Sequence, residues 1–504
     1  MTPLPPPSRI RARSGPLAAG LALMMACAGL AGCSGPDSPA EACTPYEVYG
    51  TFDGDQVTVV SAFTGVEAER FEASLVRFEG CTGIDVVHTG STSLEADLLA
   101  ASGADTATAS GATPAAKDRH QALADLAIIP QQGLVTEMVD TGVVQPLPEA
   151  VNANVELGWD RQWAQAGTYD SVPYAAPLMA SVKSLIWYSP QAFSQAGYEV
   201  PTTWAELQAL TKRIRADHPD GAVAPWCLGV ADGEATGWVM TDWLEEALLA
   251  TQGPGTYDAW WEHKIPVDDS AAVGALEEVE SLVLAPGHVL GGREGALAMT
   301  PEDAGAALVE GRCLMLHASS SFEGQLPAGT AVADASGTTT ATVPGAPQTT
   351  ASAQEGTDRT GALAPSGAAV DTSNTVTAFT VPDSQENSDA VMVGTDYVLA
   401  FSRGPAQEAV LTYLSTDRWA QARVELGGVA TANRGVDAST IPSAVARQAT
   451  VTLQSRETTM RIDASDRMPV DVGTGALWKG LTQWLSGEVT AKEALGQAES
   501  AWPS

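Results

Sequence analysis

Basic residues are scarce in this chain of 504 residues, which has 26 Lys and Arg against 61 Asp and Glu. The formal net charge of −35 repels the phosphate backbone of nucleic acids, so we set nucleic-acid binding aside. Such a charge favours solubility, but it does not indicate a ligand, because a neutral molecule is indifferent to it.

The short motifs of common enzyme and metal sites are also missing. The sequence contains no Gly-x-Ser-x-Gly turn, no His-Glu-x-x-His motif, no EF-hand spacing, and no phosphate-binding or dinucleotide-binding glycine loop after an expected strand. The 6 His are scattered and no Cys-x-x-Cys occurs, so we predict neither a metal site nor a cofactor. Among 61 acidic residues chance carboxylate pairs are inevitable, which keeps a glycosidase as the enzymatic alternative.

The N-terminus has the three parts of a secretory signal. An arginine-rich patch precedes an apolar run over 17–30. This run is shorter than the roughly 20 apolar residues that a membrane-spanning helix needs. Leu30-Ala31-Gly32-Cys33 then resembles the bacterial lipobox, which implies that Cys33 receives a diacylglyceryl group and becomes the new N-terminus. The alternative is an ordinary signal peptide followed by an unrelated cysteine. We expect a signal peptide over 1–32 and a lipidated tether over 33–44.

Cysteine is rare, and the compartment decides how it is used. Of the 6 Cys, Cys27 lies in the signal and Cys33 is the lipidation candidate. Four others remain: Cys43, Cys81, Cys227 and Cys313. Four thiols in an exported protein indicate two disulfides, for which the sequence alone allows three pairings.

The body of the chain alternates strands and helices. A valine-rich strand over 56–62 precedes a helix with a capping box at Thr64 and Glu67, and further strands are expected over 84–88 and 123–130. This order is typical of βαβ units on a parallel sheet. The pattern restarts after residue 182, so we predict an α/β protein with two domains. In this second part we expect strands over 185–188, 223–230, 313–317, 376–381 and 391–402. We expect one helix after the capping box at Thr203 and Glu206 and another after the capping box at Thr490 and Glu493. Two further helices are expected over 241–249 and 271–284.

Two segments are too poor in large apolar side chains to predict a packed core. Residues 103–116 and 331–373 consist mainly of Ala, Thr, Gly, Ser and Pro. We interpret both as surface insertions.

Several blocks in order along the chain resemble one known family. The blocks are 62–68, 125–134, 180–188, 197–204, 225–229, 235–243, 289–292, 313–317 and 465–469, the last leading to Trp478. Together they resemble the extracellular solute-binding proteins of carbohydrate ABC importers, which are related to maltose-binding protein, and among these the α-glucoside-binding lipoproteins. The blocks are specific for the family and much less specific for its ligand.

This resemblance implies a two-lobe fold of the periplasmic-binding-protein type (type II), each lobe a sheet flanked by helices, joined by a hinge of several strands. It places the N-terminal lobe at 45–180 and 393–440 and the C-terminal lobe at 181–392 and 441–504, with 331–373 as an insertion. The expected crossings lie near 180–183, 391–398 and 439–442. Within this fold we favour the disulfides Cys43–Cys81 and Cys227–Cys313, because each would lie in one lobe.

The resemblance also indicates which loops face the cleft between the lobes. The ligand-binding candidates are Thr64, Glu67, Gln131, Gln132, Lys183, Thr236, Trp238, Asp242, Asp466 and Trp478. A tryptophan face packs against the C–H face of a sugar ring, and glutamine both donates to and accepts from hydroxyls. No catalytic residue is predicted.

Each candidate has a structural alternative. Thr64 and Glu67 could serve only as a capping box, and Lys183 could be an ion-pair partner rather than a ligand contact. Trp238 could belong to the core, and Asp242 could cap its helix. His317 is better explained as a buried structural histidine. Where related proteins often have Arg-Gln after this histidine, the chain has Ala318-Ser319, so the sugar could differ.

We therefore expect a monomeric binding protein, not an enzyme, anchored to the outer face of the cell membrane through Cys33. It would capture a sugar, an α-glucoside of two or more units, and deliver it to the permease subunits of an ABC transporter. Three alternatives stay open: a receptor for a polyol or a glycerol-phosphate, a secreted glycosidase, and an adhesin with a degenerate cleft.

Overall fold

Two six-stranded sheets organise the chain. A computed structural model describes residues 42–103, 123–343, 372–384 and 390–503. The predicted signal peptide, Cys33 and most of the two low-complexity segments lie outside these residues. Residues 46–504 form one unit by their contacts, and the two lobes described below both belong to it.

The first sheet has the order β14-β13-β3-β1-β2, and β6 pairs with β13 off this path, over Val393–Leu399. Its strands are β1 (Gln56–Ser61), β2 (Asp85–Gly90), β3 (Leu126–Ile129), β6 (Ala175–Val182), β13 (Ala390–Ala400) and β14 (Thr459–Ile462). Strand β1 pairs in parallel with β2 and with β3, as the βαβ pattern predicts. All four residues of β3 are buried, which fits a strand covered on both faces.

Helices flank this sheet, and their apolar faces pack into two clusters; the larger one, called the first core below, also includes second-sheet residues such as Trp187, Leu316 and Val376. They are α2 (Gly65–Thr82), α3 (Leu94–Ser102), α6 (Gln132–Asp140), α7 (Glu149–Gly158), α8 (Arg161–Ala166), α16 (Pro405–Leu414), α17 (Asp417–Glu425) and α18 (Ala444–Gln454). A short hairpin of β4 (Thr168–Tyr169) and β5 (Val172–Pro173) precedes β6. The helix expected after the capping box at Thr64 and Glu67 is α2, whose Phe71, Leu75 and Phe78 are all buried.

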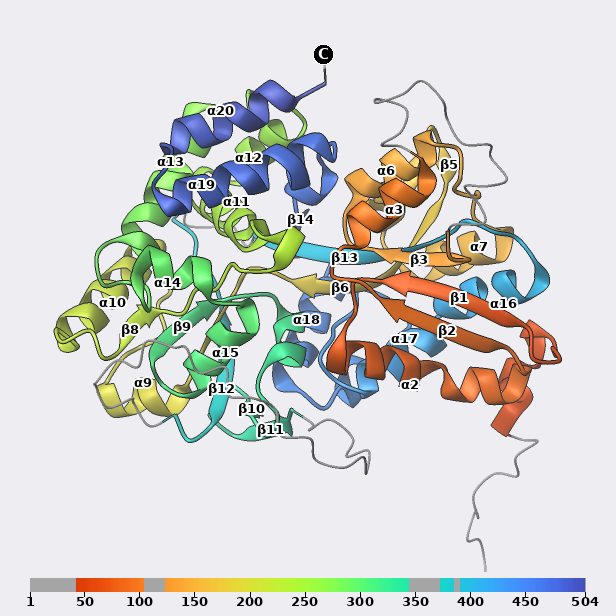
Figure 1. Ribbon diagram of the computed structural model, residues 1–504. Helices are drawn as coiled ribbons and strands as arrows, with labels where there is room; N and C mark the ends of the chain where they lie inside the picture. The colour runs from red at the N-terminus through yellow and green to blue at the C-terminus, as the bar shows by residue number, and fades with distance from the viewer. Residues whose placement is uncertain (1–41, 104–122, 344–371, 385–389, 504) are drawn as a thin grey trace, which may run out of the picture. The chain divides into compact units, whose positions relative to one another are not determined.

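The second sheet has the order β11-β10-β12-β7-β9-β8. Its strands are β7 (Leu185–Tyr188), β8 (Ala224–Trp226), β9 (Cys313–His317), β10 (Ala331–Ala333), β11 (Thr339–Thr342) and β12 (Thr375–Thr380). Its helices are α9 (Pro190–Ala196), α10 (Trp204–Asp217), α11 (Trp238–Gln252), α12 (Pro254–Trp261), α13 (Ser270–Val279), α14 (Gly292–Ala298), α15 (Pro301–Val309), α19 (Trp478–Ser486) and α20 (Ala491–Ala501). Figure 1 shows α19 and α20 beside α11 and α13, on the second lobe.

Part of the segment at 331–373 is not the insertion that its composition predicted. Strands β10 and β11 form a hairpin, and β10 pairs in parallel with β12 at the edge of the second sheet. Val332, Ala333 and Val343 are buried, so a few well-placed apolar side chains suffice to order this part. Residues 344–371 lie outside the described ranges.

The chain passes between the lobes at neighbouring strands. It leaves the first sheet at the end of β6 and enters the second at β7, and it returns between β12 and β13. At the start of β13, Met392 packs in the second core while Val393 packs in the first. Figure 1 shows β6 and β13 at the centre of the view, where these passages lie.

The segment that follows the expected third crossing at 439–442 contacts both sheets. The expected crossing holds a short 3-10 helix, Ala438–Thr440, and the following helix α18 buries Val445, Ala449 and Leu453 in the first core. Strand β14 then pairs in parallel with β13 in the first sheet. Helix α18 also contacts the second sheet, because the backbone N–H of Ala444 donates to the Thr340 hydroxyl of β11 at 2.9 Å.

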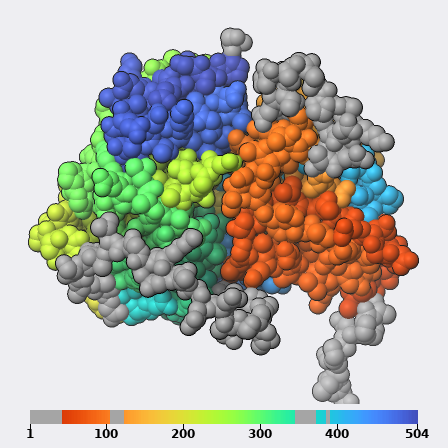
Figure 2. Space-filling view, in the orientation of Figure 1, coloured from red at the N-terminus to blue at the C-terminus, as the bar shows by residue number. Residues whose placement is uncertain are grey.

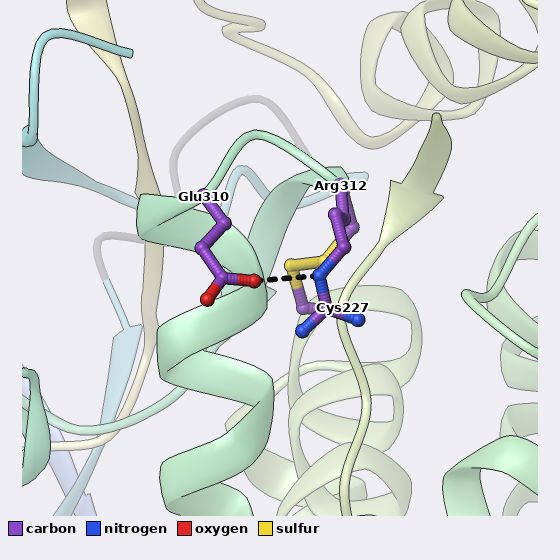
Figure 3. The surroundings of a disulfide bond; sticks show 4 residues. Cys227, Glu310 and Arg312 are labelled. Carbon is purple, nitrogen blue, oxygen red and sulfur yellow. Dashed lines mark hydrogen bonds and ion pairs between the residues drawn. A yellow bond between two sulfur atoms is a disulfide. The ribbon is translucent and has the colours of Figure 1, made fainter. Parts of the chain in front are cut away.

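A disulfide joins Cys227, directly after β8, to Cys313, the first residue of β9. This is the pairing that we favoured for these two cysteines. Figure 3 shows the bond beside the ion pair of Arg312 with Glu310, whose Nε and Oε2 atoms are 2.7 Å apart. Cys43 and Cys81 are disulfide-bonded as well.

Candidate functional site

A cavity of about 620 Å³ lies between the two lobes. The first lobe contributes Ala62, Thr64, Gly65, Val66, Glu67, Arg70, Ser91, Thr92, Ser93, Leu94, Glu95, Ala96, Leu99, Pro130, Gln131, Arg423 and Gly428. The second lobe contributes Asp232, Glu234, Ala235, Glu302, Ser321, Gly324, Gln325, Leu326, Thr474 and Trp478. Figure 2 shows the first-lobe atoms, in orange, meeting the green atoms of the second lobe along a seam.

The first-lobe wall is built by the loops that follow three parallel strands. The loop after β1 and the first turn of α2 supply Ala62 and 64–67, the loop after β2 and the first turn of α3 supply 91–96, and the loop after β3 supplies 130–131. Because β1 pairs in parallel with both β2 and β3, their carboxyl ends meet at one edge of the sheet. Open α/β sheets bind ligands at this edge.

Four of the ten predicted ligand residues line the cavity: Thr64, Glu67, Gln131 and Trp478. Thr64 is the N-cap residue of α2, yet its side chain makes no capping hydrogen bond. By contrast, Thr203 and Thr490 both accept the expected bond from the backbone of their helices. The sequence left Thr64 divided between capping and ligand binding, and in the structure its hydroxyl does not act as a cap.

Glu67 lies among charged groups at the first-lobe end of the cavity. Burial raises its pKa, and the guanidinium groups of Arg423 and Arg70 oppose that rise. These two arginines are 1% and 8% exposed, and both line the cavity. Burial lowers the pKa of Arg423 to about 10, with Glu67 opposing it. Among the described residues, the Nε atom of Arg423 is buried without a hydrogen-bond partner.

Trp478 provides the large aromatic surface of the second-lobe wall. It is 8% exposed, and within the described ranges its Nε1 atom has no hydrogen-bond acceptor. Gly237 makes its position possible, because a Cβ atom there would come within 2.5 Å of the Trp478 Cβ. An indole with a free donor beside a polar cavity is suited to a sugar ring.

Trp238 and Thr236 are hydrogen-bonded to Asp232, a residue of the cavity wall. The indole Nε1 of Trp238 donates to Asp232 Oδ2 at 2.8 Å, and the Thr236 hydroxyl accepts from the Asp232 backbone at 3.0 Å. Asp232 lines the cavity, whereas neither of these two does among the residues described. Trp238 is half-buried against the second core, so the structure supports packing and positioning roles for it.

Lys183 forms the ion pairs that we gave as its alternative. Its Nζ atom lies 2.9 Å from Asp242 Oδ1 and also bonds to Asp463. Burial raises the pKa of Asp242 to about 6, and Lys183 opposes that rise. Asp466 lies close by, and burial together with the Asp463 charge raises its pKa as well. These groups occupy the passage between the lobes, outside the described lining of the cavity.

Gln132 and His317 are both buried. The side-chain amide of Gln132, at the first turn of α6, has no hydrogen-bond partner among the described residues. The ring of His317 lies 4.6 Å from the ring of Trp243, centroid to centroid, and its Nε2 is 3.7 Å from Glu246 Oε2. These contacts fit a histidine of the core.

Sequence reasoning missed several cavity residues, including Arg70, Arg423, Glu95 and Asp232. Arg70 stands three residues after Glu67, on the same face of α2, and that spacing was a usable signal. Arg423 gave no such signal. It lies more than 350 positions from Glu67, in a helix whose sequence has an ordinary pattern of exposed and buried residues.

Two negative findings apply to the described part of the chain. There, no three or more His, Cys, Asp or Glu side chains are grouped so that they could hold a metal ion. In the same residues, no helix combines the length and apolar character needed to cross a bilayer.

Comparisons with known proteins agree with this geometry. The osmoprotective compounds-binding protein GgtB of Synechocystis sp. is 29% identical over 463 residues, which is 92% of this chain and 96% of that protein. The alpha-glucosides-binding periplasmic protein AglE of Rhizobium meliloti is 28% identical over 463 residues, 90% of this chain and 88% of that protein.

Solved structures share the fold at low identity. The bacterial solute receptor AcbH, described as preferring galactopyranose, has a TM-score of 0.65 at 16% identity, over 89% of this chain and 98% of that one. A chitin oligosaccharide binding protein has a TM-score of 0.66 at 14% identity, with the same coverage. These are two-lobe binding-protein folds of type II. Residues 64–409 match the family described as bacterial extracellular solute-binding protein. The chain therefore belongs to the family of bacterial extracellular solute-binding proteins.

Proposed function

We propose that this protein is the substrate-binding lipoprotein of an ABC importer and that it captures an α-glucoside of two or more sugar units. The observation that carries the proposal is a polar cavity between two lobes, with Trp478 on one wall and Thr64, Glu67 and Gln131 on the other. The names of the relatives GgtB and AglE support a glucoside or an osmoprotective solute.

The cavity suits such a ligand in size and chemistry. Its volume of about 620 Å³ lies in the usual range for small-molecule sites, about 300–1,000 Å³. Trp478 would pack on the apolar face of one ring, while Gln131 and Thr64 exchange hydrogen bonds with hydroxyls. Binding involves no covalent step.

Capture would couple to lobe closure. A solute that contacts both walls stabilises the closed form in proportion to its preference for that form. The closed form would then dock on the permease subunits. Lipidation at Cys33 would keep the receptor at the outer face of the membrane, and Cys33→Ala should release it from membranes. Retention of this variant in the membrane fraction would contradict the anchor.

A thermal-shift screen tests the function. The purified protein would be heated with maltose, trehalose, sucrose, maltotriose, glucose, polyols and glycerol-phosphates. A ligand that binds the folded state raises the melting temperature with a logarithmic dependence on its free concentration. Saturable stabilisation by an α-glucoside supports the proposal. Stabilisation by a polyol alone would favour the second candidate, an osmoprotectant receptor, which the name of GgtB suggests. No shift in a well-folded sample would contradict both.

A further inference from the structure

The positive and negative side chains of the cavity are unevenly distributed along its walls. At the end that contains Arg70 and Arg423, carboxylates of Glu67 and Glu323 accompany the two guanidinium groups. The remaining wall carries four more carboxylates: Glu95, Asp232, Glu234 and Glu302. None of these four forms an ion pair with a cation among the residues that the structure describes. This wall therefore has negative charge without a counterion.

Glu95 is the best-defined member of the acidic wall. Its Oε1 atom accepts a hydrogen bond from the Thr474 hydroxyl of the second lobe at 3.0 Å. Its Oε2 atom is buried and, in the described ranges, has no donor. Burial raises the pKa of Glu95, and the nearby carboxylates of Asp471 and Glu234 raise it further. No cation opposes them among these influences.

Trp478 gives a second and independent sign of a ligand at the same place. It stands four residues after Thr474, so the two side chains share one face of the helical segment, and Thr474 bonds to Glu95. Its indole is more than nine-tenths buried with an unpartnered Nε1 donor. An aromatic face next to carboxylates attracts a positive charge through the ring quadrupole as well as through the charges.

We propose that this acidic wall is a subsite for a positively charged group of the solute, so that the receptor prefers a glycoside bearing a protonated amine. Glu95 Oε2 accepts a hydrogen bond from the ammonium group, and the Trp478 face packs against the same ring. Glu234 adds attraction from the second lobe, so the cation lies between the two walls when they close. The inference rests on the proposed function, since it names the class of sugar that the same cavity takes.

The test compares matched sugars by isothermal titration calorimetry on the full protein. The probes are maltose and trehalose, each with its 2-amino-2-deoxy derivative and the N-acetylated form of that derivative, at a pH where the amine is protonated. A charge-assisted hydrogen bond should make the amine bind about tenfold tighter than the neutral parent. The N-acetyl form, which is similar in shape but neutral, should lose that gain. Equal or weaker binding of the amine would overturn the subsite.

Variants locate the effect. Glu95→Gln keeps an acceptor for Thr474 but removes the charge, so the ratio of the amine's affinity to that of its neutral parent should fall to about one. Glu234→Gln, at an exposed position, should reduce the preference in part without a risk to folding. Glu156→Gln removes the same charge from the exposed face of α7 and should leave the preference intact. A preference that survives Glu95→Gln would refute the role of Glu95.

The two proposals fail in different ways. If neutral glucosides bind and their amino derivatives bind no tighter, the subsite is wrong and the receptor function stands. If neither neutral nor amino sugars bind to a well-folded protein, the receptor function is wrong and the subsite falls with it.

Discussion

At the scale of single residues, the cavity is lined by side chains that do not make the usual structural hydrogen bonds. Thr64 occupies an N-cap position without capping, and Trp478 is buried with an unused donor. A buried polar group without a partner costs about 1–3 kcal/mol. Trp478 carries this cost because its indole is buried, whereas Thr64 is exposed and only lacks the capping bond that Thr490 makes.

Trp478→Ala should weaken binding of the preferred sugar by about 1–3 kcal/mol, because it removes an aromatic platform from the wall. Isothermal titration calorimetry measures this loss. Trp238→Ala is the matched control, since Trp238 contacts the cavity only through Asp232. It should lower the melting temperature more than the affinity. A larger loss of affinity in Trp238→Ala than in Trp478→Ala would reverse the assignment of the two indoles.

Carboxyl groups in the passage between the lobes make stability depend on pH. Burial raises the pKa of Asp242 to about 6 and that of Asp396 to about 7, and in both cases Lys183 opposes the rise. The usual aspartate pKa is near 3.9. Between about pH 4 and pH 7 the folded state therefore binds more protons than the unfolded state, so the free energy of unfolding falls as the pH rises. Below this window stability falls as well, because the pKa of Asp463, paired with Lys183, is lowered.

We expect urea denaturation to give a free energy of unfolding that drops by on the order of 2 kcal/mol between pH 5 and pH 7.5. The high net charge acts in the same direction, so a variant is needed to separate the two. Asp396→Asn removes one titrating group and should flatten the slope. An unchanged slope in this variant would show that general repulsion, rather than Asp396, causes the dependence.

At the scale of elements, the second sheet is joined covalently where two of its parallel strands meet. Cys227 and Cys313 lie 86 positions apart, next to β8 and β9. Closing a loop of that size restricts the unfolded chain, and the chain-entropy treatment gives about 4–5 kcal/mol. The same strands carry Trp226 and Met315 in the core, so packing would hold the native geometry without the bond.

The double variant Cys227→Ser, Cys313→Ser should fold and bind sugar, but its free energy of unfolding should be lower by about 3–5 kcal/mol. Chemical denaturation of both proteins in the oxidised state measures the difference. Cys43 and Cys81 remain unchanged in the variant and serve as the internal control. A difference below about 1 kcal/mol would mean that residual structure around β8 and β9 already restricts the unfolded chain without the disulfide.

At the scale of the molecule, the cavity exists because residues far apart in the sequence line the two walls. Thr474 and Glu95 are separated by 379 positions and are joined by a hydrogen bond across the cavity. The passages at β6, β13 and after β14 lie side by side in the first sheet, since β13 pairs with both of the others. Adjacent passages allow rotation of one lobe against the other without unfolding either.

We expect the radius of gyration from small-angle X-ray scattering to decrease on addition of the sugar that stabilises the protein. The control is a sugar from the same panel that gives no thermal shift. Hydrogen exchange should slow in 91–99 and 470–478, the two segments that face each other through Glu95 and Thr474. A thermal shift without any change in scattering would mean that the sugar binds without lobe closure.

The sequence by itself determined the elements, the family and four of the cavity residues. Strands and the apolar face of a helix such as α2 are local patterns that repeat every two or 3.6 residues. They can therefore be predicted without knowledge of the fold. Thr64, Glu67, Gln131 and Trp478 follow from the blocks that resemble the family. The order of strands within each sheet and the place of β14 were not readable, because they depend on pairings between distant segments.

Only the tertiary structure decided which charges meet. Lys183 was ambiguous in the sequence, since its partner Asp463 lies 280 positions away. Arg423 and Glu95 became cavity residues only when the helices α17 and α3 were placed around the same sheet. Charge interactions depend on distance and burial rather than on local spacing, and both of these are set by the packing of the whole chain.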